Sequence, residues 1–236
     1  MQPIGKRLAA RRVTAGLAIA NPRERNNAFI GRDVDYLKAP TDAAKFSLFS
    51  RYANIDLVYS PRFVADRYLD GSRISFFSLP SDGYIGKDNT LKTNKPKDWF
   101  SDDEAALRVY QTLGSYELAA YGYRGFWKNP SGYEPATNSY TFPALSVYGA
   151  SARGPVARGI GSIEFGYYDS RDDSPGKDPL VHNSEIRLLL GYEQEAARNF
   201  NVGLQYYLEH MQDHDNYLDN LPSGAPERDE DRHLLT

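Results

Sequence analysis

The stretch Ser162–Asp173, SIEFGYYDSRDD, changes character in its middle. In its first half Ile163, Phe165 and Tyr167 alternate with polar or small residues, Glu164 among them, and the second half is acidic. Successive side chains of a β-strand point to opposite sides, so this pattern places a carboxylate on one face and an apolar stripe on the other. The stretch therefore predicts a strand with two different faces that runs into a polar loop.

The same period of two residues recurs along the chain from residue 51 onward. Seven runs show it clearly when the opening stretch is included, and two more are partial. The clear runs are 52–60, 104–112, 115–127, the segment after Pro143, 160–168, 185–195 and 200–209, and the partial ones are 45–51 and 232–236. Repeated short runs of this kind predict an all-β fold.

The connections between these runs alternate between two kinds. Residues 113–114, 154–159 and 195–199 are short links, whereas 128–142, 169–183 and 212–231 are long and polar. An antiparallel up-and-down sheet with turns at one rim and loops at the other produces this order, and transmembrane β-barrels are built this way. The longest connection, 61–102, is either folded into or over a pore or is a solvated loop with an extra hairpin.

Composition and charge restrict the class of protein further. The chain has 236 residues, no Cys and a formal net charge of -3, and its basic residues are scattered. These values exclude disulfide and thiolate sites and argue against nucleic acid as a partner. No apolar run reaches the roughly 18 residues of a membrane-spanning helix, but β-barrel strands need only about 9 to 11 residues.

The first 28 residues stand apart from the strand pattern. Basic residues precede a short apolar run, Val13–Ala20, which has the order of a secretory signal. The run is short for a signal and contains Thr14 and Gly16, so a plain strand or an irregular start fits as well. The expected organisation is an irregular or signal-like segment at 1–28 and a β-barrel segment at 29–236.

The polarity of the two strand faces favours a membrane barrel over a soluble sandwich. The polar faces carry single carboxylates beside Tyr, Ser and Gly, and the apolar faces end in aromatic residues of the kind that forms interfacial girdles. Expected lumen-lining residues are Asp56, Glu104, Arg108, Glu117, Tyr121, Glu164, Glu185, Arg187, Gln205 and Glu209. Expected lipid-facing or girdle residues are Tyr59, Tyr116, Phe165, Tyr167, Tyr192 and Tyr206.

No motif in the sequence predicts catalysis or a cofactor. The glycine-rich segment Gly154–Gly161 lacks the Lys and Ser/Thr of a phosphate-binding loop, and the surroundings of Ser151 lack the last Gly of a nucleophile elbow. Asp169, Asp172 and Asp173 are weak candidates for a cation site, without calcium-loop spacing. The expectation is a protein that is not an enzyme and needs no cofactor.

Three segments carry a resemblance to a known class of proteins. They are Phe29–Pro40 (FIGRDVDYLKAP), Asn54–Phe77 (NIDLVYSPRFVADRYLDGSRISFF) and Ser146–Gly161 (SVYGASARGPVARGIG). Over about residues 29–236 the chain resembles a poorly characterised class of large porin-like outer-membrane β-barrels of Gram-negative bacteria. The resemblance implies an outer-membrane location and passive or selective passage of solutes, and it covers the middle of such a barrel, so a fragment is expected.

The expected function is therefore a porin-like channel for small polar solutes. Its acidic column would favour the passage of cations if the lumen contains water, or would form internal salt bridges if side chains fill the lumen. The carboxylates of this column are Asp56, Glu104, Glu117, Glu164, Glu185, Glu193 and Glu209. Its partners would be outer-membrane lipids and small polar solutes, with no nucleic acid. The alternatives are a plugged structural or ligand-binding barrel, and a soluble all-β carbohydrate-binding or hydrolytic domain that uses Glu117, Glu164 or Glu185.

Overall fold

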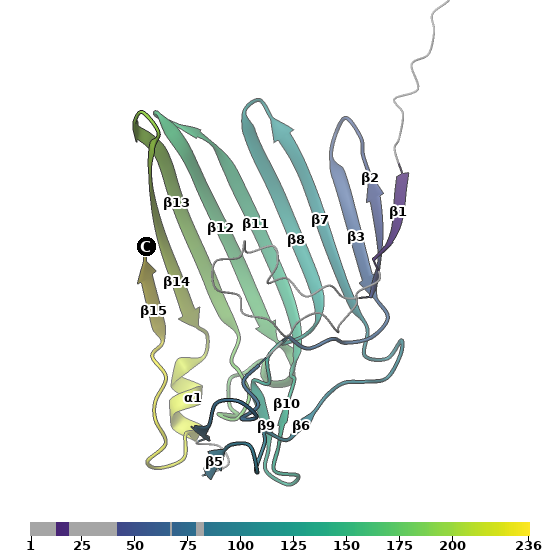
Figure 1. Ribbon diagram of the computed structural model, residues 1–236, viewed down its shortest axis with the longest axis vertical. Coiled ribbons are helices and arrows are strands. Elements are labelled where there is room, and N and C mark those ends of the chain that lie inside the picture. Colours follow the sequence, from purple (N-terminus) through teal and green to yellow (C-terminus); the bar gives the residue numbers. More distant parts are fainter. Residues whose placement is uncertain (1–12, 19–41, 67, 79–82) are drawn as a thin grey trace, which may run out of the picture.

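The fold is dominated by one antiparallel sheet (Figure 1). The computed structural model describes residues 13–18, 42–66, 68–78 and 83–236. Ten strands form the sheet in the order β1-β2-β3-β7-β8-β11-β12-β13-β14-β15. Their bounds are β1 Val13–Ala18, β2 Ala43–Leu48, β3 Asn54–Ser60, β7 Glu104–Leu113, β8 Tyr116–Phe126, β11 Ala144–Val156, β12 Gly159–Ser170, β13 Glu185–Ala197, β14 Phe200–Met211 and β15 Asp231–Leu235.

Each strand of this sheet pairs with the strand that precedes it in the sheet order, and every pair is antiparallel. The all-β, up-and-down antiparallel architecture is thus confirmed. Within the described residues β1 and β15 form the two edges and do not pair with each other, so these strands form an open sheet and not a closed barrel. Figure 1 shows the strands side by side between these two edges, with β15 at one and β1 at the other.

The seven clear sequence runs all form long strands of this sheet, namely β3, β7, β8, β11, β12, β13 and β14. The two partial runs form β2 and β15. Val13–Ala18 forms β1 and pairs with β2, as the plain-strand interpretation of the first segment requires. The expected boundary between residues 28 and 29, and the resembling segment Phe29–Pro40, lie outside the described residues.

The alternation of short and long connections is also confirmed. Tight turns join β7 to β8, β11 to β12 and β13 to β14 at one rim, and long segments follow β3, β8, β12 and β14 at the other (Figure 1). Gly114, in the turn that joins β7 to β8, has φ +63°, a backbone conformation that glycine adopts without steric cost. We call the two ends of the sheet the turn rim and the loop rim.

The long connections contain short elements, of which the sequence analysis considered only an extra hairpin in 61–102. Strands β4 (Phe76–Ser78) and β5 (Gly83–Ile85) form a hairpin. Strand β6 (Thr93–Asn94) pairs in parallel with β10 (Ser139–Thr141), which pairs with β9 (Gly132–Glu134), so two distant connections share one small sheet. The connection after β12 contains the 3-10 turn η3 (Arg171–Asp173), and the one after β14 contains α1 (His214–Asn220).

The buried core lies at the loop rim. Phe63, Trp127, Phe142, Leu145 and Tyr217 are buried there, whereas large apolar side chains in the middle of the strands are exposed. Such exposure follows from a sheet that has no second layer packed on it within the described residues. No helix in the described ranges has the length and hydropathy that a bilayer-spanning helix needs.

Candidate functional site

A single cross-strand row fixes which side chains share a face of the sheet. Residues directly opposite each other on paired strands project to the same side, so a chain of register partners identifies one face. One such row runs across seven neighbouring strands: Asp56, Arg108, Tyr121, Gly149, Gly166, Arg187 and Glu209. We call the face that carries this row the polar face.

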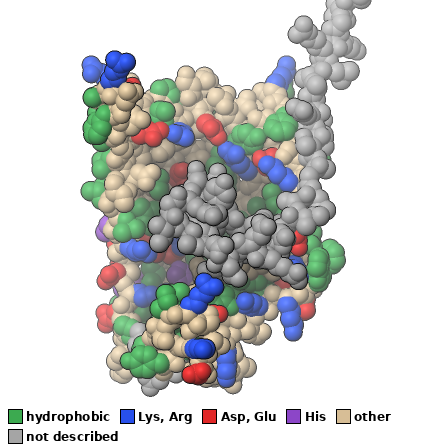
Figure 2. Space-filling model, in the orientation of Figure 1, with side chains coloured by type: hydrophobic (Ala, Val, Ile, Leu, Met, Phe, Trp, Pro, Cys, Tyr) green, Lys and Arg blue, Asp and Glu red, His purple; other side chains and the backbone are tan. Residues whose placement is uncertain are grey.

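All ten residues predicted to line a lumen lie on the polar face. Five of them are in the row itself: Asp56, Arg108, Tyr121, Arg187 and Glu209. The other five precede a row member by two or four residues on its own strand: Glu104, Glu117, Glu164, Glu185 and Gln205. Figure 2 shows acidic and basic side chains gathered over the upper part of the sheet, within its hollow. Whether this face lines a pore stays a prediction.

The opposite face, which we call the apolar face, carries the six predicted girdle residues. Tyr167 pairs with Tyr148 and Ile186, and Phe165 pairs with Ala150 and Leu188. Tyr59, Tyr116, Tyr192 and Tyr206 project to the same side, as the registers of their strands show. Many large side chains here are exposed: Phe46, Leu57, Leu107, Leu118, Tyr148, Ile163, Phe165, Leu190 and Leu204.

The apolar face is free of charged side chains over most of its height. On β8 and β12 the first charged residues on this side are Arg124 and Asp169, which both lie directly opposite Ser146 of β11, near the loop rim. Between these residues and the turn rim, Leu118, Ala120, Ile163, Phe165 and Tyr167 provide only aliphatic or aromatic groups. On β8 and β12 the apolar face is therefore without charge between the loop rim and the turn rim, and its charged residues, like the His210–Asp231 pair of β14 and β15, lie near the loop rim.

Most carboxylates of the polar face have cationic partners. Asp56 accepts a hydrogen bond of 2.5 Å from Ser47 Oγ and lies 3.1 Å from Lys45 Nζ. Arg108 Nη2 donates to Glu117 Oε1 at 2.8 Å. These pairs neutralise much of the acidic column, because each carboxylate meets a cation across or along the strands.

A further pair crosses the sheet near the turn rim. Arg153 Nη2 donates to Glu193 Oε1 at 2.8 Å, and it reaches from β11 over β12 to β13. Both side chains are more than half exposed, so the energy of this pair alone is small. The pair nevertheless shows that side chains of non-adjacent strands meet on the polar face.

Glu104 and Glu185 are on the polar face, and their side chains are buried and paired with cations. Glu104 is 5% exposed, and both of its carboxylate oxygens accept hydrogen bonds of 2.6 Å from Lys128 Nζ. Tyr123 Oη donates to the same carboxylate at 2.6 Å. A buried charge must be paired in this way, so Glu104 belongs to the structural core at the loop rim.

Glu185 forms the second buried charge cluster of the loop rim. It is 3% exposed and forms an ion pair with Arg187, while His182 Nε2 lies 3.2 Å from its other carboxylate oxygen. The guanidinium of Arg187 lies 4.1 Å from the centre of the Tyr168 ring and 3.9 Å from a carboxylate oxygen of Glu209. Arg187 is thus the cation that two acidic side chains share.

Two hollows open on the polar face between these clusters. One has a volume of about 420 Å³ and is lined by Arg153, Ser162, Glu164 and Gln205 among others. The other has a volume of about 390 Å³ and is lined by Tyr121, Ser151, Glu164, Arg187 and Tyr207 among others. Glu164 belongs to the walls of both hollows, so it lies where they meet.

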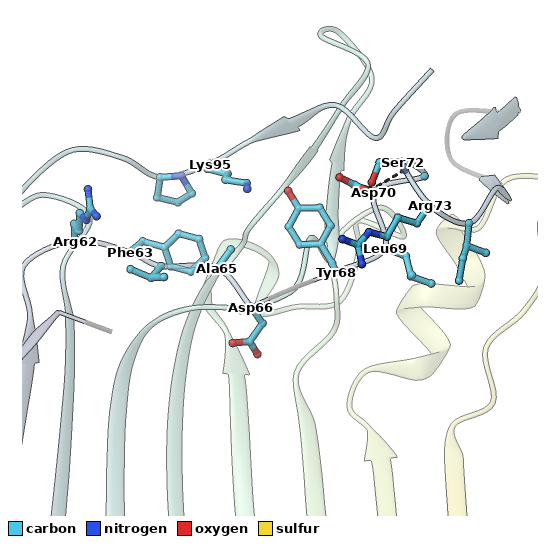
Figure 3. Close-up of a pocket in the computed structure, with 14 residues that line it drawn as sticks. Arg62, Phe63, Ala65, Asp66, Tyr68, Leu69, Asp70, Ser72, Arg73 and Lys95 are labelled. Atoms are coloured by element: carbon cyan, nitrogen blue, oxygen red, sulfur yellow. Dashed lines mark hydrogen bonds between the residues drawn. The ribbon is translucent and has the colours of Figure 1, made fainter. Parts of the chain in front are cut away.

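A larger pocket lies in the long connection at the loop rim (Figure 3). It has a volume of about 600 Å³ and is lined by residues 62–66, 68–74 and 95–96. Arg62, Arg73 and Lys95 contribute cationic groups to it, and Figure 3 shows Tyr68 between Lys95 and Arg73. Hydrogen bonds from the Ser72 hydroxyl and backbone N–H hold the pKa of Asp70, on its wall, below the usual range.

The connection that forms this pocket is packed against the loop rim. Phe63 is buried between Phe126 and Phe142, at ring-centre distances of 5.3 and 5.1 Å. Asp66 N–H donates to the carbonyl of Lys128, and Lys128 Nζ donates to the carbonyl of Val64. The first part of the 61–102 connection therefore lies across the end of the sheet as an ordered segment.

The three aspartates considered for a cation site hold the backbone of the loop rim. Asp172 accepts the backbone N–H of Ala144 at 2.8 Å, and Asp173 accepts that of Asp178 at 2.6 Å. Asp169 projects from the apolar face and accepts a long hydrogen bond from Ser174. No group of three or more potential metal ligands occurs in the part of the chain that the structure describes. The structure thus does not bring these carboxylates together as a metal site.

Sequence reasoning did not identify the cations that neutralise the polar face. Lys45, Lys128 and Arg153 were not among the predicted site residues, although each contacts an acidic side chain. Alternation along β2 and β11 could have placed Lys45 and Arg153 on the polar face. Lys128 follows the end of β8, and alternation carries no information beyond a strand end.

Comparison of the chain with protein-family models, with curated proteins and with solved structures finds no match. The resemblance of its segments to porin-like barrels therefore has no support from these comparisons, and any function must be argued from the two faces of the sheet.

Proposed function

We propose that the chain forms part of the wall of a porin-like β-barrel in the outer membrane of a Gram-negative bacterium, where small polar solutes diffuse past its polar face. The observation that carries this proposal is the segregation of charge. One face of the sheet holds acidic and basic side chains, and the other holds exposed apolar ones. A soluble monomer rarely exposes a contiguous apolar surface of this extent, whereas a barrel wall in lipid requires one.

The height of the apolar face supports the same proposal. On β7 the residues that project to this face, from Ala105 to Leu113, carry no charge. This segment has a length close to the roughly 9 to 11 residues that a tilted transmembrane strand needs. The short turns at one rim and long loops at the other are typical of outer-membrane barrels.

The proposal requires the sheet edges to be paired in the membrane. Unpaired backbone groups cost several kcal/mol each in a hydrocarbon environment, so an open sheet is not stable there. Strands β1 and β15 would therefore pair with each other, with further strands, or with a second copy of the chain. The exposed β15, which pairs with β14 through residues 231–235, is available on its other side in the described residues.

A plugged barrel is the second candidate, and a specific observation favours it. Residues 61–66 lie across the loop rim and bury Phe63 in the core there. In this arrangement the connection narrows or closes the mouth, and the pocket lined by Arg62, Tyr68 and Lys95 would be the surface that solutes meet first. This candidate differs from the first only in conductance.

Two measurements test the proposal. Expressed in a Gram-negative host, the chain is expected in the outer-membrane fraction, and its mobility in gels is expected to change on boiling, as for folded barrels. In planar bilayers we expect stepwise conductance in KCl. Membrane insertion without conductance would favour the plugged barrel, and a soluble protein insensitive to boiling would exclude both membrane candidates.

A further inference from the structure

Glu164 occupies the centre of the polar face. It lies directly opposite Ser151 of β11 and Leu189 of β13, near the middle of the sheet. It belongs to the walls of the two hollows of about 420 and 390 Å³. A group that entered either hollow from the polar side would therefore meet this carboxylate.

The charge of Glu164 is unmatched, in contrast to the other carboxylates of the acidic column. Within 4.0 Å, each of the other six has a cationic side chain as partner: Asp56, Glu104, Glu117, Glu185, Glu193 and Glu209. Glu164 has no ion pair and accepts no hydrogen bond from another side chain within the described ranges. Glu185 and Glu209 share one cation, Arg187, and Glu164 is the one carboxylate of the column that has none within the described ranges.

The two cations that share the hollows with Glu164 are held by other acids. Arg153, in the first hollow, donates to Glu193, and Arg187, in the second, is bound by Glu185 and lies near Glu209. These cations therefore compete poorly with an incoming positive charge, because each is already compensated.

The surroundings of Glu164 leave room for such a charge and can solvate it. Gly149, Gly166 and Gly191 occupy polar-face positions on or beside its strand, so no long side chain covers the carboxylate from them. Ser162 and Gln205 line the first hollow with oxygen atoms that can accept hydrogen bonds. Because divalent cations such as Ca²⁺ take six or more oxygen ligands, often several carboxylates, a lone carboxylate suits a monovalent one.

We infer that Glu164 is a binding site for a compact monovalent cationic group, either a hydrated alkali ion or the ammonium group of a polar solute, and that it sets the charge preference of the polar face. This inference rests on the proposed pore function for its role in transport. The site itself requires only the geometry of the polar face.

Ion selectivity of the 236-residue chain in planar bilayers tests the inference. With a KCl gradient, the reversal potential gives the permeability ratio of K⁺ to Cl⁻, and wild type is expected to prefer K⁺. Glu164→Gln should lower the ratio about fivefold, which is the Boltzmann factor for two unit charges in contact in water. Glu164→Asp should retain the preference, and Glu164→Lys should reverse it.

A control separates a site from net charge. Glu195→Gln removes the same charge at the exposed turn rim. It should leave the ratio close to that of wild type. A ratio for Glu164→Gln no lower than that for Glu195→Gln would overturn the inference, while conductance itself would leave the pore proposal intact.

Binding in detergent micelles distinguishes failure of the site from failure of the pore. Calorimetric titration with spermidine, whose ends are compact ammonium groups, should show binding that Glu164→Gln weakens about fivefold and Glu195→Gln does not. If wild type conducts no ions but shows this binding pattern, the site stands and the pore proposal fails. If Glu164→Gln binds spermidine as wild type does, the site is refuted, whatever the conductance.

Discussion

At the scale of single residues, burial decides which charges of the polar face are structural. Glu104 is buried at the loop rim. Tyr123, within β8, and Lys128, just after the end of β8, both donate hydrogen bonds to its carboxylate. Glu164, on β12 and three strands away in the sheet order, has the same side chain without partners in the described residues. The same residue type thus serves as a core ion pair in one place and as an accessible charge in another.

Replacement of Glu104 by Gln is expected to destabilise the protein by about 2–4 kcal/mol. The amide can still accept the hydroxyl of Tyr123, but it cannot compensate the ammonium of Lys128, which remains two-thirds buried. The free energy of unfolding in urea measures the effect. Glu195→Gln, an equal change on an exposed side chain, should alter stability by less than about 0.5 kcal/mol. Equal effects of the two variants would contradict a structural role for the Glu104 pair.

At the scale of elements, the long strands could be predicted from the sequence, whereas the connections could not. Alternation is a local property of a strand with two different environments, so it identified the runs that form β3 through β14 of the main sheet. Strands such as β6, with two residues, are too short to show any period. Their pairing with a connection some 45 residues away depends on how the loops pack, as the contact of Thr93 with Tyr140 shows.

The candidate site divides in the same way. Membership of a face follows from alternation, so Glu164 and Tyr121 could be placed on one side from sequence alone. The ion pairs depend on the register between strands and on the reach of the side chains, and neither of these can be predicted from the sequence. Arg153 and Glu193, which meet from non-adjacent strands, are an example. Turn geometry shows the same limit: the ladder of β11 and β12 continues to Val156 and Gly159, inside the segment predicted as a turn.

The ordered start of the 61–102 connection is expected to depend on Phe63. Phe63→Ala removes the ring that packs against Phe126 and Phe142, and buried Phe→Ala changes cost about 3–5 kcal/mol. Because this segment lies at one end of the sheet, we expect it to open locally while the strands persist. Trypsin should then cleave after Arg62 and Arg73 faster than in wild type, with an unchanged far-UV circular dichroism spectrum.

Phe77→Ala is the matched control in the same connection. Phe77 is 46% exposed, against 6% for Phe63, so its loss should leave the cleavage rate close to that of wild type. If Phe63→Ala is cleaved no faster than this control, the segment is not held at the loop rim by its aromatic contacts. The plugged-barrel candidate would then lose the observation that favours it.

At the scale of the whole molecule, the question is what solvates each face of the sheet. Strand β12 carries the carboxylate of Glu164 on one face and the side chains of Ile163 and Phe165 on the other. This arrangement is unfavourable if both faces contact the same solvent. If water contacts the polar face and lipid contacts the apolar face, both faces of every long strand are in a favourable solvent. The proposal that the two faces of the sheet contact two different solvents can be tested directly.

Leu189 and Leu190 allow that test with one substitution made on each face. They are neighbours on β13, and Leu190 pairs with Ile163 on the apolar face, where it is 40% exposed. Leu189 lies on the polar face opposite Glu164, where an introduced guanidinium would meet an unpaired carboxylate. If the apolar face is in lipid, Leu190→Arg should cost about 2–4 kcal/mol near the bilayer midplane, and Leu189→Arg should cost close to nothing.

The measurement is the free energy of unfolding in urea of each variant folded into phospholipid vesicles. Arginine at the exposed position 190 would be well solvated if the face were in water, so a soluble sheet predicts little loss for Leu190→Arg. The same substitution at 189 controls for the lower β-propensity of the new residue, since both positions are in the middle of one strand. Equal stabilities of the two variants would place water on both faces and exclude a membrane-spanning wall.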